Sequence, residues 1–253
     1  NPRAMIPAID IAAIEDELEE LVDRLGEAEE DILRDPNLDP SPLVVALRER
    51  LDDLRQHQAR AEAQIFTANY QTALGQDITA QGDQAIDLLV RLAALAGRLR
   101  QPHLARDLEE LAFPLAVWIA RHEGEILSLA TVVNAAAALA NRLEQPQELA
   151  ELHGLLREIG AALSPAVNQE TGHLDPTSPW RVFLINRAIV ATRSHQPALM
   201  KEAFEALTEY LPQKASEFFR EGMEQMEALN YPMPVRAVME AWYAQWCERR
   251  LLH

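Results

Sequence analysis

The chain has 253 residues, of which 48% are hydrophobic and 25% are charged, so it has enough apolar mass for a folded core and is not a disordered segment. It carries 23 Lys and Arg against 40 Asp and Glu, a net charge of −17, which disfavours binding to nucleic acid or to an anionic membrane surface. The longest uncharged run has 16 residues and is too short and too polar to span a membrane. Cys247 is the sole cysteine. This composition predicts a cytoplasmic protein without disulfides.

The first 75 residues show two heptad patterns. The first runs in alternating steps of three and four, at Ile11, Ile14, Leu18, Leu21, Leu25, Ala28 and Ile32. A break rich in Asp and Pro follows, in which Ser41 and Pro42 are typical of an N-cap and a first helical position. The second pattern comprises Val44, Leu47, Leu51, Leu54, Gln58, Ala61, Ile65 and Ala68. We therefore expect an antiparallel coiled-coil hairpin over about residues 8–75, forming a first domain of residues 1–78.

Acidic residues are concentrated on the first of these helices. Residues 8–35 contain twelve Asp or Glu against Arg24 and Arg34, a net charge of −10. This pattern indicates either a solvated outer face or an acidic docking surface for a basic partner. The hairpin could also form a homodimer, because a two-helix coil buries more apolar surface when it meets a second copy.

A seven-residue pattern recurs three times beyond residue 79. The copies are A-G-R-L-R-Q-P from Ala96, A-N-R-L-E-Q-P from Ala140 and A-T-R-S-H-Q-P from Ala191, and they share Ala, Arg, Gln and Pro. Proline fixes φ and lacks an N–H, so it suits the first position of a helix and disrupts a helix interior. Each Gln-Pro pair therefore predicts the end of one helix and the start of the next.

These boundaries predict four helical hairpins, which form a second domain of residues 79–253. The helix pairs are expected at 84–100 with 102–121, 126–143 with 146–162, 180–195 with 197–210, and 213–229 with 234–250, the last of which lacks the motif. Pro114 is expected to kink or split the second helix of the first pair. Hairpins with one apolar flank bury it by stacking on their neighbours.

Over residues 83–250 the chain resembles the α-solenoid class, the tetratricopeptide-like and HEAT-like arrays of helical hairpins. The copies are 44 and 51 residues apart, longer than a tetratricopeptide unit of about 34 residues. The predicted fold is therefore all-α: a two-helix coiled-coil hairpin followed by a short α-solenoid of about four hairpins. The resemblance implies binding of a protein or peptide on a concave surface.

Two groups of residues are candidates for partner binding. Stacked hairpins would align Arg98, Arg142 and Arg193 in a row able to grip an acidic group, unless each pairs with an Asp or Glu nearby. Asn134 and Asn141 could add amide contacts. The second group lies near the C-terminus and comprises Phe219, Met223, Met226, Trp242 and Trp246, which form either the core of the last hairpin or an adaptable groove for a helix.

The sequence offers little chemistry for catalysis. None of the seven histidines has another histidine three or four residues away, and the sole E-x-x-H, Glu170 to His173, lies among Gly and Pro residues typical of a loop. Metal binding there, with help from Asp175, would be weak. We therefore expect no catalytic residue, no metal site and no cofactor.

The predicted function is that of a protein-interaction adaptor or scaffold, within which a chaperone-like role stays open. It is expected to bind a partner protein or peptide on the solenoid surface, and neither nucleic acid nor a membrane. The alternative is an all-helical small-molecule sensor or regulatory domain with an internal pocket lined by Trp118 or by the C-terminal aromatic residues.

Overall fold

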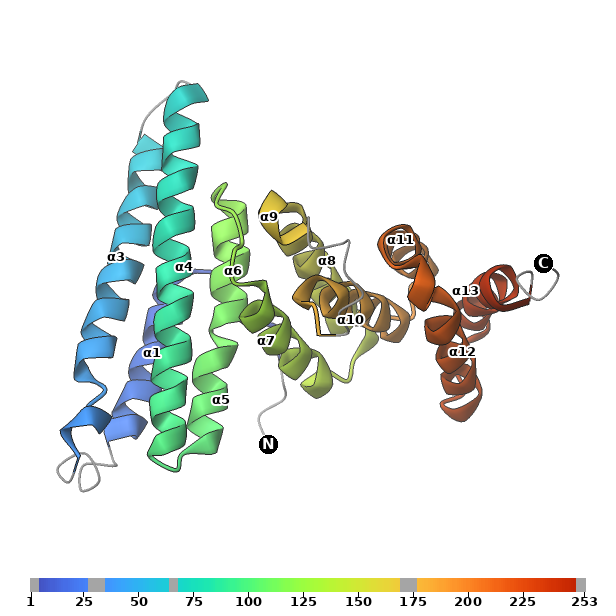
Figure 1. Ribbon diagram of the computed structural model, residues 1–253, viewed down its shortest axis with the longest axis horizontal. Coiled ribbons are helices and arrows are strands. Elements are labelled where there is room, and N and C mark those ends of the chain that lie inside the picture. Colours follow the sequence, from blue (N-terminus) through green and yellow to red (C-terminus); the bar gives the residue numbers. More distant parts are fainter. Residues whose placement is uncertain (1–4, 27–34, 64–67, 169–176, 249–253) are drawn as a thin grey trace. The chain divides into compact units, whose positions relative to one another are not determined.

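The computed structural model describes residues 5–26, 35–63, 68–168 and 177–248 (Figure 1). These residues form helices that pack mostly against their neighbours in the chain, and they contain no strand, which confirms the predicted all-α class. The chain divides into two compact units. The first comprises residues 7–139 and 157–168, and the second comprises residues 140–156 with the described residues of 1–6 and 169–253.

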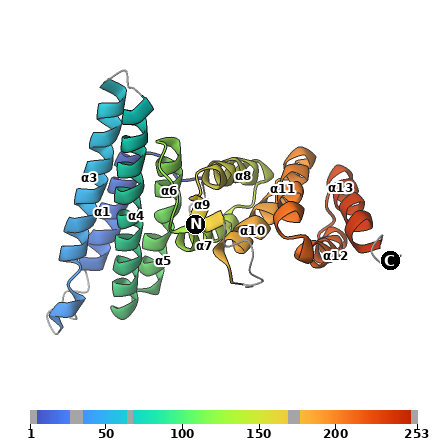
Figure 2. The same ribbon diagram turned by 45° about the horizontal axis from the view of Figure 1, so that its top comes forward.

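The first unit is a helical bundle. Its helices are α1 (Ile11–Gly26), the 3-10 turn η1 (Pro36–Leu38), α3 (Ser41–Ala63), α4 (Ala68–Arg98), α5 (Pro102–Glu110) and α6 (Ala112–Arg121), with the greater part of α7 (Leu129–Arg142), the end of α8 (Pro146–Ala161) and the short α9 (Pro165–Asn168). Helix α3 packs along α4, and α1 packs on α3, α5 and α6 (Figure 2).

The predicted antiparallel pairing of the first two helices is present between α1 and α3. Their seam residues Ile11, Ile14, Leu18, Leu21, Leu25, Val44, Leu47, Leu51 and Leu54 are all buried. Arg48 donates to the Glu19 carboxylate at 2.6 Å and Arg55 to Glu15 at 3.0 Å, so residue numbers rise on one helix as they fall on the other. The seam positions Ala28, Ile32, Ala61, Ile65 and Ala68 lie outside the described side chains.

Helix α4 extends the bundle beyond what the sequence predicts. We expected the second hairpin helix to end near residue 75 and a new helix to begin near residue 84, and this was wrong, because α4 runs without interruption from Ala68 to Arg98 and contains Gly75 and Gly82. A Cβ on Gly75 would lie 2.7 Å from the Glu123 carbonyl oxygen, and one on Gly82 would lie 2.4 Å from Ile119 Cδ1. The two glycines therefore allow α6 and the turn after it to approach α4 closely. The predicted domain boundary at residue 78 falls inside this helix, and the domain division stays a prediction.

Pro114 splits its helix as predicted. Helix α5 ends at Glu110 and α6 begins at Ala112. Proline lacks the N–H that would bond to the carbonyl four residues earlier, and its ring clashes with that carbonyl, which here belongs to Glu110. Helix α6 is almost wholly buried from Ala112 to Ile119 and forms the centre of the bundle.

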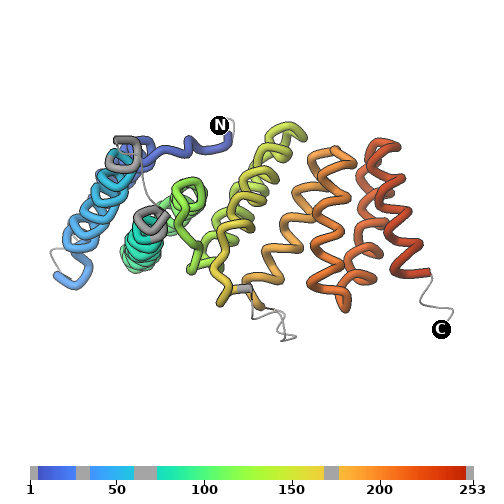
Figure 3. Tube along the Cα trace, turned by 90° about the horizontal axis from the view of Figure 1, so that it is seen from above, coloured from blue at the N-terminus to red at the C-terminus, as the bar shows by residue number. Residues whose placement is uncertain are grey.

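The second unit contains the remaining helices, packed in chain order (Figure 3). After the end of α7 and most of α8, it comprises α10 (Pro179–Arg193), α11 (Pro197–Tyr210), α12 (Pro212–Ala228), α13 (Met233–Tyr243) and a terminal π-helical turn, η3 (Ala244–Glu248). Helix α11 packs on α10 and α12, and α13 packs on α11 and α12. Phe204 and Phe219 lie at the centre of this core with Trp242.

The repeated motif connects the end of one helix to the start of the next in all three copies. Its arginines are the last residues of α4, α7 and α10, and its prolines are the first residues of α5, α8 and α11. The helix starts that the three Gln-Pro pairs predict are thus confirmed. None of the described helices has the length and hydropathy needed to cross a membrane.

Gly75→Ala tests the close approach of α6 to α4. We expect it to lower the free energy of unfolding by about 1–3 kcal/mol, because the new methyl group would overlap a backbone oxygen. Gly97→Ala is the matched control in the same helix, since nothing lies within 4 Å of its added Cβ. It should raise stability by up to about 1 kcal/mol through helix propensity. Chemical denaturation followed by circular dichroism measures both, and equal stabilisation by the two variants would show that the contact is not tight.

Candidate binding groove between helices α10 and α12

Arg193 ties together two helix ends of the second unit. Its guanidinium donates to the carbonyl oxygens of Ala140 and Leu143, each at 2.8 Å, at the C-terminal end of α7. The last four carbonyls of a helix have no partner within the helix, so donors from outside stabilise its end. Arg193 is half-buried and acts here as a bridge between the second and third copies of the motif.

The other two motif arginines are more exposed. Arg98 donates to the backbone carbonyl of Asn37 at 3.3 Å, and Arg142 is exposed at the end of α7. The sequence left two alternatives for these arginines, an anion-binding row or pairing with Asp and Glu. Arg98 and Arg193 instead donate to backbone carbonyls, which suits a cation near the negative end of a helix dipole.

The motif's alanine carbonyl accepts a hydrogen bond in each copy, from a different donor each time. The backbone N–H of Gln101 donates to Ala96 at 2.9 Å, and the Ser194 hydroxyl donates to Ala191 at 2.6 Å. In the second copy the donor to Ala140 is Arg193. The alanine carbonyl is therefore an acceptor in every copy, whereas its donor differs. In the second copy the donor is the arginine of the third copy.

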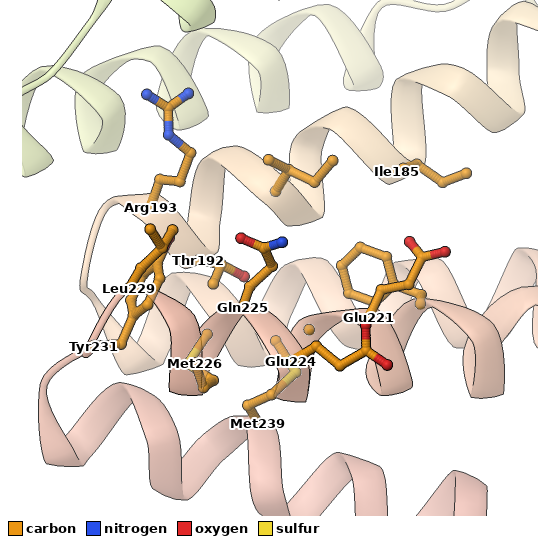
Figure 4. Close-up of a pocket in the computed structure, with 13 residues that line it drawn as sticks. Ile185, Thr192, Arg193, Glu221, Glu224, Gln225, Met226, Leu229, Tyr231 and Met239 are labelled. Atoms are coloured by element: carbon orange, nitrogen blue, oxygen red, sulfur yellow. The ribbon is translucent and has the colours of Figure 1, made fainter.

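A groove of about 610 Å³ lies between α10 and α12. Its lining residues are Ile185, Ile189, Thr192 and Arg193 from α10, Phe218, Glu221, Gly222, Glu224, Gln225 and Met226 from α12, and Leu229, Tyr231 and Met239 beyond it. Figure 4 shows Ile185 and Glu221 towards one end of the groove and Arg193, Leu229 and Tyr231 towards the other. The two helices thus run in the same direction along its length.

The groove has an apolar interior that is open to solvent. Ile189 is 42% exposed and Leu229 is 63% exposed, although both are large aliphatic side chains. Met226 and Met239, which also line the groove, are buried. Gly222 leaves room for the Met239 thioether, since a Cβ at that position would lie 2.6 Å from both Sδ and Cε of Met239. The floor is therefore formed partly by α13.

Polar groups are distributed unevenly around the groove. Glu221 and Glu224 are exposed on α12, three residues apart and therefore neighbours on the same side of that helix. At the opposite end, burial raises the pKa of the Tyr231 hydroxyl, and the nearby charge of Arg193 partly opposes this shift. Tyr231 consequently stays protonated at neutral pH and can donate a hydrogen bond.

The predicted aromatic and methionine residues divide between the groove and the core. Met226 lines the groove, whereas Phe219 is fully buried and contacts the rings of Phe204 and Trp242, so it supports the groove from beneath. Met223 and Trp246 are half-buried outside the lining. Asn134 and Asn141 are both exposed on α7. Trp118, proposed for an internal pocket, is 2% exposed in the core of the first unit and stacks on His122.

Sequence reasoning missed the residues that make the groove accessible, notably Ile189 and Leu229. A partial signal was present in α12, because Phe218, Gly222, Met226 and Leu229 recur in steps of three and four along one face. Nothing in the periodicity indicates that the end of this stripe stays exposed.

A second cleft, of about 470 Å³, lies between α3 and α4 and is polar. Its Arg50 side chain donates to Gln81 at 2.9 Å and pairs with Asp53 at 3.2 Å, while Asp83 accepts from Ser128 at 2.6 Å. These groups satisfy one another, so we interpret the cleft as a solvated surface. Among the described residues no cluster of three His, Cys, Asp or Glu has the arrangement of a metal site. The Glu170–His173 motif lies outside the described residues.

Comparison of the chain with protein-family models, curated proteins and solved structures finds no match.

The bridge made by Arg193 predicts a stability effect. We expect Arg193→Ala to lower the free energy of unfolding by about 2 kcal/mol, because two carbonyls lose a charged donor. Arg98→Ala is the control, and its exposed single contact at 3.3 Å should change stability by less than about 0.5 kcal/mol. Urea denaturation measures both variants. Equal effects would mean that the motif arginines act alike and that the bridge to α7 has no special role.

Proposed function

We propose that this chain is a non-enzymatic interaction adaptor that binds an apolar helical segment of another protein in the α10–α12 groove. The observation that carries the proposal is the pair of exposed aliphatic side chains, Ile189 and Leu229, in the lining of a mainly apolar groove. Soluble proteins seldom expose large apolar patches without using them for binding. An amphipathic helix laid in a groove would bury this surface.

An α-solenoid architecture, which we infer from the order of helix packing, would favour the same function. In the second unit α10 to α13 pack successively, and α10 and α12 run in the same direction with α11 between them in the chain. Stacked helical hairpins would pack in this order, with the first helices of successive hairpins lining one surface. In this interpretation the antiparallel pair α1 and α3 comes before the solenoid in the chain and is part of the first unit.

A small apolar ligand is the second candidate for the same site. The groove volume falls within the range of about 300–1,000 Å³ that is typical of small-molecule pockets. Thr192, Gln225 and Tyr231 would supply the few polar contacts that orient such a ligand. A ligand of this kind would be displaced by, or compete with, a peptide in the groove.

A peptide-display selection tests the adaptor proposal. Random peptides of about 16 residues are selected on the intact chain and counter-selected on Ile189→Asp/Leu229→Asp, which places two charges on the groove walls. We expect enriched peptides to lose at least about tenfold in affinity on this variant, because each anchor loses its apolar contact. Fluorescence anisotropy of labelled peptides provides the dissociation constants.

Val45→Asp is the matched control for this selection. Val45 is 52% exposed on α3 in the first unit and does not line the groove, so its substitution adds a charge at a comparably accessible aliphatic position outside the proposed site. Peptide affinity should not change. Enriched peptides that bind the groove variant as tightly as the unmodified chain would exclude the groove as the docking site.

A further inference from the structure

The two edges of the α10–α12 groove differ in charge, and this difference indicates what kind of helix it accepts. The α10 edge presents Ile185 and Ile189, whereas the α12 edge presents Glu221 and Glu224. Glu221 and Glu224 are both exposed, so their carboxylates face solvent beside the apolar floor (Figure 4). A partner would meet aliphatic groups along one side and two negative charges along the other.

The positive charge within the lining is already engaged. Arg193 donates to the carbonyl oxygens of Ala140 and Leu143, which places its charge at the end of α7. The Arg193 charge therefore does little to neutralise the two glutamates. Glu221 lies towards the other end of the groove and Glu224 lies near its middle (Figure 4). The chain's net charge of −17 adds a long-range field of the same sign.

We propose that the occupant is a cationic amphipathic helix of another protein, with its apolar stripe in the groove and Lys or Arg along the edge that faces Glu221 and Glu224. The proposal rests on the adaptor function and specifies its partner class. From Phe218 to Leu229 the lining follows about three turns of α12, roughly 17 Å, so the bound segment spans a similar length. Its basic residues recur three or four positions apart, which matches the separation of the two glutamates.

The same charges disfavour a second copy of this chain as the occupant. Helix α1 is amphipathic, but its polar face is acidic, and the two chains repel each other on average. A basic partner gains from the field both in encounter rate and in the contacts at the edge. Electrostatic attraction should therefore make binding sensitive to salt.

The test uses the peptides that bind the intact chain but do not bind the Ile189→Asp/Leu229→Asp variant. The expected sequences combine apolar residues at helical spacing with Lys or Arg on one flank of that stripe. Glu221→Gln/Glu224→Gln should weaken such a peptide about three- to tenfold and reduce the salt dependence of its affinity, since exposed ion pairs contribute modestly. Glu205→Gln/Glu209→Gln, which neutralises two exposed acids on α11 outside the lining, should have a smaller effect.

Charge reversal gives the sharpest comparison. Glu221→Lys/Glu224→Lys should reject the basic peptide and bind a version in which its flanking Lys residues are replaced by Glu, a pattern that a purely structural role of the glutamates would not produce. Circular dichroism and thermal unfolding confirm that each variant is folded.

The possible outcomes separate this inference from the proposed function. Groove-dependent peptides that are acidic or uncharged, or that bind the Gln variant unchanged, would overturn the cationic partner and leave the adaptor function standing. Concentration-dependent dimerisation that the groove variant abolishes would identify a second copy of this chain as the occupant. That result would also overturn the cationic partner. Failure to recover any groove-dependent peptide would overturn both.

Discussion

The need to satisfy the last carbonyls of each helix governs how this chain turns. Its helices end with few glycines, the residue that most easily adopts the left-handed conformation suited to a helix end. Arg100, His195 and Asn230 adopt this conformation instead, with φ values of 59°, 56° and 50°. Each is followed by one residue and then by a proline, which is the first residue of α5 and of α11 and directly precedes α13. Neighbouring donors supply the hydrogen bonds that hold these turns, and the helices they connect pack in order.

The local features of the fold followed from the sequence because their causes are local. Proline at Pro102, Pro146 and Pro197 fixes where helices start, whatever surrounds them. The fourth turn, predicted between residues 229 and 234, carries no copy of the motif, because Asn230 and Pro232 reproduce the geometry without its Ala, Arg and Gln. Its arginine equivalent comes from the other side of the turn, where Arg236 donates to the carbonyls of Met226 and Tyr231. A motif search that compares residue identities does not find turns that share a backbone conformation but differ in sequence.

Features that depend on tertiary packing could not be predicted from the sequence. Gly75 and Gly82 favour a helix break by intrinsic propensity, yet both lie inside α4 because another part of the chain occupies the space beside them. The groove poses the same difficulty. Phe219 and Met226 belong to one aromatic and methionine cluster in the sequence, but the packing of α11 and α13 buries Phe219 in the core and leaves Met226 at the groove. Periodicity identifies an apolar face without showing how much of it a neighbour covers.

The contact between Gly222 and Met239 gives the groove a floor of unusual compliance. A thioether side chain is unbranched and rotates easily about three bonds, and here its end occupies the space left by an absent side chain on the facing helix. Rotation of this one group would deepen or fill the centre of the groove while the backbones of α12 and α13 stay in place. The site could thus accommodate anchors of different volume at its midpoint, so selectivity among partners would depend on the charged edge more than on the size of the central residue.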